Sequence, residues 1–169
     1  MMKKFVFILF AVLSLPVLAQ DGAEYVKTLV ENNRVSFSYT LSPKGHKKVK
    51  MEGKAVIDGD CYRLHGNELE IVCDGQTKWT IDVAAKEVYI ETAESTRDFI
   101  ANMPGWIGNV KDLKVSGSTI SGTYEDASQG QAMTFKFSSI SSSPLSGSTE
   151  GFSYDAASLG GDWVVTDLR

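Results

Sequence analysis

Hydrophobic and polar residues alternate along most of this chain, which is the pattern of β-strands that bury one face. The clearest case surrounds Asp74-Gly75, a turn dipeptide followed by alternating runs at residues 77–82 and 86–90. An Asp-Gly pair beside alternating runs predicts a β-hairpin. Read in this way, the chain predicts about eleven short strands, at residues 35–41, 49–57, 62–64, 69–71, 77–82, 86–90, 111–116, 119–126, 132–139, 151–155 and 162–168. Strands spaced like this, with turn signals between them, indicate an antiparallel sandwich or barrel.

Two short segments have helical spacing instead. Residues 21–32 begin with Asp21 and Glu24 in a capping-box arrangement and carry an apolar face of Tyr25, Val26, Leu29 and Val30. A second capping box at residues 95–98 opens a helix from Phe99 to Met103, which Pro104-Gly105 is expected to end. Between them, the two helices offer little cover for so many strands. The serine-rich residues 138–148 are expected to form a loop.

The apolar sides of the strands collect a set of bulky side chains. These are Phe37, Tyr39, Met51, Tyr62, Ile71, Trp79, Ile81, Val88, Ile90, Tyr124, Met133, Phe135 and Phe137. A sheet with one such face must cover it. A curved sheet closed by only two short helices would leave an apolar concavity. Periodicity alone favours the alternative, a filled core, so both interpretations stay open at this point.

The first residues have the pattern of a secretory signal. Lys3 and Lys4 precede an apolar run at residues 5–15, which has the length of a signal-peptide core and is too short to span a bilayer. Small residues at 17 and 19 place the cleavage after Ala19. We therefore expect a signal peptide at residues 1–19, one domain at residues 20–169, and a periplasmic location without a membrane anchor, because no cysteine follows the cut.

Charge excludes one class of partner and suggests no chemistry. The formal net charge is −4, and it becomes −6 without Lys3 and Lys4, with both signs interspersed along the chain. Nucleic acid is therefore not expected as a partner. His46 and His65 do not combine with the two cysteines in a zinc pattern, and no catalytic motif is present. We expect neither a metal, nor a cofactor, nor an enzymatic activity.

Several motifs, taken in order, resemble a known family. They are the helix leading into Val35-Ser36-Phe37-Ser38-Tyr39, the run Met51-Glu52-Gly53-Lys54-Ala55-Val56 before Tyr62-Arg63-Leu64, the turn Asp74-Gly75-Gln76-Thr77-Lys78-Trp79, and Phe152-Ser153-Tyr154-Asp155 before the final residues 164–169. Together they cover most of residues 20–169 and resemble the LolA-like outer-membrane lipoprotein carriers of the Bacteroidetes type. The turn followed by Trp79 is the most distinctive of them.

The resemblance implies a fold and a function. It implies an incomplete antiparallel β-barrel with a helical lid, and a soluble periplasmic carrier that binds the acyl chains of lipoproteins in an apolar cleft. The thirteen bulky residues above would then line the cleft, and Phe99, Ile100, Met103, Trp106 and Ile107 would form the lid. The implied partners are acylated lipoproteins, an inner-membrane lipoprotein-releasing transporter and an outer-membrane receptor, with the carrier acting as a monomer.

The chain departs from the better-known carriers at the lid. Those carriers have an arginine before the Asp-Gly turn that helps to hold the lid closed, and the shorter segment at residues 58–62 has no equivalent. Arg63 and Arg97 are near in sequence, but a surface ion pair or a snorkelling side chain is the better interpretation of each. Two other functions stay open: a LolA-like module that senses lipid or lipoprotein, and an interaction domain with a filled core.

The two cysteines present a choice of register. Cys61 and Cys73 flank a hairpin predicted over Gly66-Asn67. A two-residue turn would pair Tyr62 with Ile71 and separate the cysteines to opposite faces, whereas a turn longer by one residue would set them side by side. Because the expected compartment is oxidising, we predict a disulfide between Cys61 and Cys73.

Overall fold

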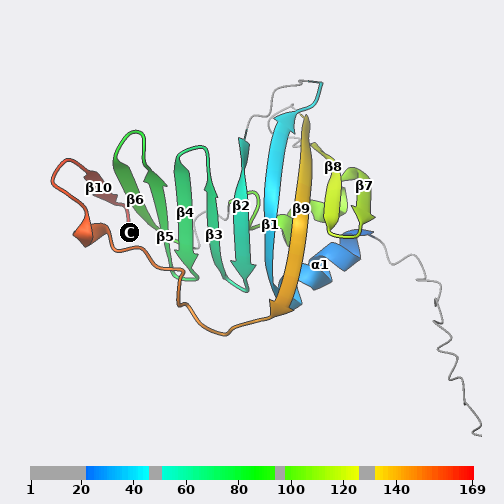
Figure 1. Cartoon of the computed structure of the whole chain (residues 1–169), viewed down its shortest axis with the longest axis horizontal. Coiled ribbons are helices and arrows are strands. Elements are labelled where there is room, and N and C mark those ends of the chain that lie inside the picture. The colour runs from blue at the N-terminus through cyan, green and yellow to red at the C-terminus, as the bar shows by residue number, and fades with distance from the viewer. Residues whose placement is uncertain (1–21, 46–50, 94–97, 126–131) are drawn as a thin grey trace, which may run out of the picture.

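The structure is a computed structural model that describes residues 22–45, 51–93, 98–125 and 132–169. It is mainly β, as the alternation predicted, and its strands form one open sheet that does not close into a barrel. Ten strands lie in the order β10-β6-β5-β4-β3-β2-β1-β9-β8-β7 (Figure 1). Within these residues, two short α-helices accompany the sheet.

The elements follow one another with short connections. The helices are α1 (Gly22–Asn32) and α2 (Met103–Trp106), with short 3₁₀ helices η1 (Ile107–Asn109) and η2 (Ala156–Ser158). The strands are β1 (Asn33–Pro43), β2 (Met51–Asp58), β3 (Cys61–Gly66), β4 (Leu69–Asp74), β5 (Thr77–Asp82), β6 (Glu87–Thr92), β7 (Lys111–Ser116), β8 (Thr119–Glu125), β9 (Ala132–Pro144) and β10 (Val164–Asp167).

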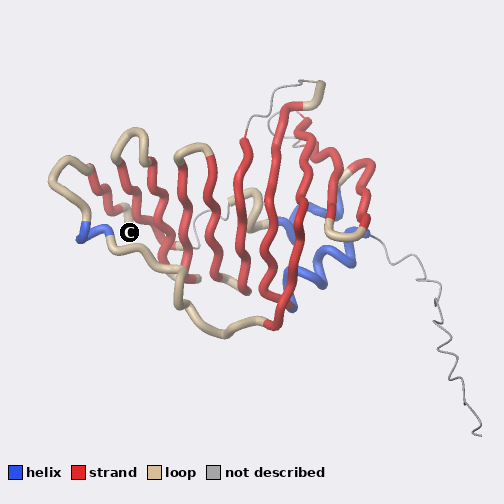
Figure 2. The backbone as a smooth tube through the Cα atoms, viewed as in Figure 1, coloured by secondary structure: helices blue, strands red, loops and turns tan. Residues whose placement is uncertain are grey.

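The sheet departs from the predicted antiparallel arrangement at one edge. Every described pairing is antiparallel except that of β10, which pairs with β6 in parallel, Val165 opposite Val88. The reason is the connection before β10. We call residues 145–163 the strap; it runs from the end of β9 along one end of the sheet to the far edge (Figure 2). Such a crossover delivers the chain to the same end at which β6 begins.

The strap replaces one predicted strand, and β9 absorbs part of a predicted loop. Residues 151–155 are a turn and an extended segment within the strap instead of a strand. The serine-rich residues 138–144 belong to β9, where Ser141 lies opposite Ser36 of β1 and their hydroxyls are 2.8 Å apart. These serines extend a ladder because β1 is long enough to pair with Ser138 and with residues 141–144, on either side of an irregularity at Ser139 and Ile140.

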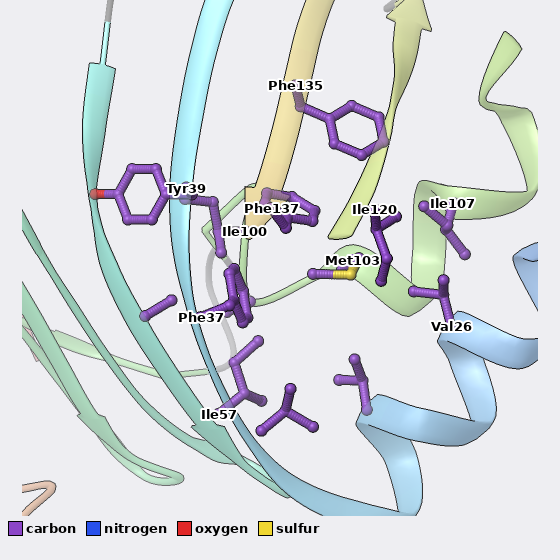
Figure 3. Packing of buried hydrophobic residues seen from close by; sticks show 14 of the residues in the cluster. Val26, Phe37, Tyr39, Ile57, Ile100, Met103, Ile107, Ile120, Phe135 and Phe137 are labelled. Carbon is purple, nitrogen blue, oxygen red and sulfur yellow. The ribbon is translucent and has the colours of Figure 1, made fainter. Parts of the chain in front are cut away.

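The helices cover one face of the sheet, which we call the helix face. It carries Val35, Phe37, Tyr39 and Leu41 of β1, all buried, and against it pack Val26 and Val30 of α1 and Met103, Trp106 and Ile107 from the α2–η1 segment. Figure 3 shows Phe37, Phe137, Met103 and Ile120 filling the space between β1, β9 and these helices. Between the helices and strands β1 and β9, the apolar face therefore forms a filled core, one of the two interpretations that the sequence left open.

The first predicted helix exists with changes at its ends, whereas the second prediction, Phe99 to Met103 ended by Pro104-Gly105, is wrong in its position, because the helix runs from Met103 to Trp106. In α1 the residues Val26, Leu29 and Val30 face the core, but Tyr25 is exposed, and Ala23 is buried in its place. The cap at Asp21 lies outside the described residues, as do residues 95–97 of the capping box predicted at residues 95–98. The second helix begins later than predicted: residues 99–102 are turns, and Pro104 lies in the first turn of α2. Proline is tolerated there because the first backbone amides of a helix have no partner within it.

Candidate functional site

A half-open cleft lies on the helix face, beside the filled core. Its cavity volume is about 510 Å³, and it is lined by Tyr39, Leu41, Met51, Leu64, Gly66, Asn67, Leu69, Ile71, Asp82, Asp98, Phe99 and Ile100. Most of these side chains are apolar. A volume of this size and an apolar lining are typical of sites for small ligands.

Strand register explains why these side chains meet. Leu41 lies opposite Met51, Leu64 opposite Ile71, and Leu69 opposite both Gly66 and Asp82. Facing residues of antiparallel strands point to the same side of a sheet, so the floor of the cleft is built from the ends of β1 to β5 that lie nearest the β3–β4 turn. Asn67, in the β3–β4 turn, is the exposed residue of the lining, so we take the cleft to open there and call this end its mouth.

Two glycines shape the floor. A Cβ atom at Gly53 would lie 2.1 Å from the carbonyl oxygen of His65 and 2.7 Å from the hydroxyl of Tyr39, and one at Gly66 would lie 2.0 Å from the carbonyl oxygen of Glu52. Distances this short are not possible for real side chains, so β2 and β3 approach here only because both residues are glycine. The ring of Tyr39 lies across this part of β2 (Figure 3).

Aromatic packing fixes the inner wall of the cleft. The ring of Phe99 stacks on Trp106 with centroids 4.3 Å apart and planes 8° apart, and both rings contact Tyr124 at 5.1 and 5.3 Å. The indole Nε1 of Trp106 donates a hydrogen bond to the backbone oxygen of Phe99 at 2.7 Å. The wall is therefore held by α2 instead of forming a free loop.

A hydrogen bond also holds the start of this wall. The hydroxyl of Tyr62 donates to Oδ2 of Asp98 at 2.7 Å. Burial raises the pKa of Tyr62, and the charge of Asp98 raises it further, so the phenol stays protonated and remains a donor. Arg97 lies outside the described residues. Arg63 is on the opposite face of the sheet, where its Nε lies 3.5 Å from Glu70, and it does not reach this wall.

The structure divides the thirteen predicted cleft residues into three groups. Tyr39, Met51 and Ile71 line the cleft. Phe37, Tyr62, Phe135 and Phe137 are buried in the filled core, with Tyr124 and Met133 packed against it. The remaining four, Trp79, Ile81, Val88 and Ile90, lie on the other side of the sheet, which we call the strap face.

That last placement is a correction with a clear cause. Val72 of β4 lies opposite Trp79, and Val72 points away from Ile71, a cleft residue. β4 therefore has apolar residues on both faces, and from β5 onward the apolar side is the strap face. There Val72, Ile81, Val88 and Ile90 are covered by Tyr154, Ala156, Leu159 and Trp163 of the strap. Alternation within each strand predicts which residues share a face, but not which face of the sheet that is.

The predicted lid is also divided. Phe99 and Ile100 line the cleft, whereas Met103, Trp106 and Ile107 are buried in the core. Sequence reasoning missed Leu41, Leu64 and Leu69, although each alternates with polar neighbours in its strand. It also missed both carboxylates of the cleft, Asp82 and Asp98, since no spacing signal marks a polar residue that faces an apolar site.

The predicted disulfide is not formed. Cys61 and Cys73 are free and buried, and the hairpin between them turns at Asn67-Glu68, one residue later than predicted. Tyr62 therefore lies opposite Cys73, and Cys61 points to the other face of the sheet. Burial raises the pKa of both thiols and keeps them protonated.

Neither known proteins nor metal-binding geometry identifies this site. No protein-family model matches the chain, and no curated protein matches it. Among the described residues, no group of three or more His, Cys, Asp or Glu side chains could hold a metal ion. In the same part of the chain, no helix is both long and apolar enough to cross a membrane.

Proposed function

We propose that this protein binds acyl chains in the helix-face cleft and carries acylated lipoproteins through the periplasm, from the inner membrane to the outer membrane. The observation that supports this most is the cleft itself, an apolar cavity of about 510 Å³ that stays open beside an otherwise filled core. The open sheet would serve as the incomplete barrel of such carriers, and Phe99 and Ile100 as the part of the lid that an acyl chain touches.

Physical chemistry suits this role. Burying an acyl chain is worth about 0.8 kcal/mol per CH₂ group, so lipoprotein acyl chains cannot stay exposed while crossing water. A carrier needs an apolar site that is already formed but still open, so that the chain can leave again. The floor made by Leu64, Leu69 and Ile71 meets the first need, and the mouth beside Asn67 meets the second. A releasing transporter and an outer-membrane receptor are the partners that this proposal requires.

Filling the cleft tests the proposal. The probes are the uncharged dye N-phenylnaphthylamine and a triacylated lipopeptide. Ile71 is half-buried at the floor, so Ile71→Trp should occupy the cavity without breaking the fold and should weaken binding of both probes by about tenfold or more, as the loss of a few buried CH₂ contacts implies. Val165→Trp, at an exposed position of β10, is the matched control and should bind like the original protein.

The outcomes separate the three functions that the sequence left open. An interaction domain with a filled core would bind neither probe. A sensing module would bind both but would not speed the transfer of lipopeptide from donor to acceptor vesicles, whereas a carrier would. If Ile71→Trp fails to fold, Leu69→Trp at the mouth provides the same test. Unchanged binding in both folded variants would contradict the assignment of this cleft.

A further inference from the structure

The charged side chains that line the cleft, within the part of the chain that the structure describes, are both acidic. Its lining is apolar apart from Asn67, the hydroxyl of Tyr39 and two carboxylates, Asp82 and Asp98. Asp82 ends β5 at the mouth, opposite Leu69, whereas Asp98 lies beside Tyr62. Within the described residues, no Lys or Arg side chain lines the cavity.

Neighbouring charges on the helix face reinforce this sign. Glu87 lies opposite Asp82 in the β5–β6 pair, and Glu91 lies opposite Lys78 toward the other end of the same pair. Lys78 is the cation of this group, and its ammonium forms an ion pair with Glu91 at 3.0 Å. The β5–β6 part of the helix face therefore adds further negative charge beside the mouth.

We propose that the cleft selects ligands whose apolar chain carries a cationic or uncharged polar head, and that Asp82 and Asp98 are the residues that reject fatty acids and anionic phospholipids. This inference rests on the proposed function, because it concerns the specificity of the same cleft. A carboxylate beside an apolar cavity is screened less than one in bulk water, so an anionic head placed there is repelled and a cationic one attracted.

Both aspartates can be neutralised without losing the hydrogen bonds that they accept. Oδ1 of Asp82 accepts from the backbone amide of Ala85 at 2.8 Å, and Oδ2 of Asp98 accepts from the hydroxyl of Tyr62. An asparagine carbonyl oxygen can accept at either position. Asp82→Asn with Asp98→Asn therefore removes charge while keeping local structure, which makes it a test of specificity rather than of folding.

The experiment uses three amphiphiles with the same dodecyl chain. Dodecyltrimethylammonium, octaethylene glycol dodecyl ether and dodecanoate each displace bound N-phenylnaphthylamine below their micellar concentrations. We expect the cationic chain to bind about tenfold more tightly than dodecanoate, as charge-assisted contacts imply, with the uncharged chain between them. In the doubly substituted protein, the dissociation constants of the three amphiphiles should lie within about twofold of one another. Glu31→Gln with Glu150→Gln, exposed positions on α1 and the strap, is the control with equal charge change and should keep the difference.

The possible results distinguish failure of the specificity inference from failure of the proposed function. Dodecanoate binding as tightly as the cation, or a difference that persists in the doubly substituted protein, would overturn the inference while leaving an acyl-binding cleft. No displacement by any of the three amphiphiles from a dye-binding protein would contradict the proposed function itself, and so would a protein that does not bind the dye. If the double variant does not fold, Asp82→Asn alone, at the mouth, should narrow the difference in the same direction.

Discussion

Asp58 is the residue that ties the strap to the sheet. Its buried carboxylate accepts hydrogen bonds from the backbone amide of Ser146 at 3.1 Å, from the Ser146 hydroxyl, and from Arg34 at 3.2 Å. Arg34 also lies over the ring of Phe152, 5.4 Å from its centroid. Burial alone would raise the pKa of Asp58, but the bonds from Ser146 and the charge of Arg34 outweigh it, and the pKa is lowered.

This shift predicts a loss of stability in acid. Because the pKa of Asp58 is lower in the folded state, its contribution is complete above the unfolded-state value of about 3.9 and is lost as the pH falls through the folded-state value. We expect Asp58→Asn to lower the free energy of unfolding by about 1–3 kcal/mol at pH 7, since it removes the buried negative charge that accepts hydrogen bonds from Arg34 and Ser146. Urea denaturation between pH 7 and pH 3 measures both effects.

The substitution should also flatten the pH dependence. The original protein should lose more stability between pH 5 and pH 3 than Asp58→Asn does, and Glu150→Gln, an exposed position of the strap, should behave like the original protein. Equal slopes for all three proteins would show that the ionisation of Asp58 does not stabilise the strap.

Residue roles of this kind lie beyond the reach of sequence patterns. Asp58 and Ser146 are 88 positions apart, and neither belongs to a motif. The alternation correctly placed Tyr39, Met51 and Ile71 on the apolar sides of their strands, where they line the cleft, but alternation alone favoured a filled core at these positions. It could not predict Asp98, because its contact with Tyr62 depends on where the segment before α2 crosses the sheet.

At the scale of elements, the strap gives the sheet a second covered face. Val72, Ile81 and Val88 are buried beneath it, and Trp163 lies half-buried over them immediately before β10. Alternation and turn residues predicted the first nine strands. Most of these strands pair with the next strand along the chain, and β1 also pairs with β9, another long strand. The parallel pairing of β10 did not follow, because nothing local to residues 164–167 indicates which strand they join.

Trp163 tests how much the strap contributes to stability. Trp163→Ala should lower the free energy of unfolding by about 1–3 kcal/mol, less than the cost for a fully buried tryptophan because this ring is half-buried. The adjacent Val164 is 58% exposed, so Val164→Ala should change stability by no more than about 0.5 kcal/mol. Chemical denaturation of both variants makes the comparison. Equal effects at the two positions would mean that the strap does not form a packed layer on the sheet.

For the whole molecule, the main feature is that the apolar side of the sheet changes at β4. On one side of this strand the helix face is covered by α1 and α2, and on the other side the strap face is covered by residues 154–163. The cleft occupies the boundary, where helix cover ends and the helix face becomes polar along β5 and β6. An apolar cavity with an acidic border is a consequence of that change of face.

The helices and the strap cover opposite faces of the sheet, so a ligand bound in the cleft should not change what the strap contributes to stability. In the proposed binding mode N-phenylnaphthylamine would contact only the helix face, and at one hundred times its dissociation constant it should stabilise the folded state by about 2.7 kcal/mol. For a domain of this size, that predicts a rise in melting temperature of about 5–10 °C. Trp163→Ala should melt lower but show the same rise, because effects at distant sites without shared partners add. Ile71→Trp, with its cavity filled, should show almost none. Differential scanning calorimetry with and without dye measures all three proteins, and a Trp163→Ala protein that no longer responds to the dye would mean that the strap and the cleft are coupled through β4.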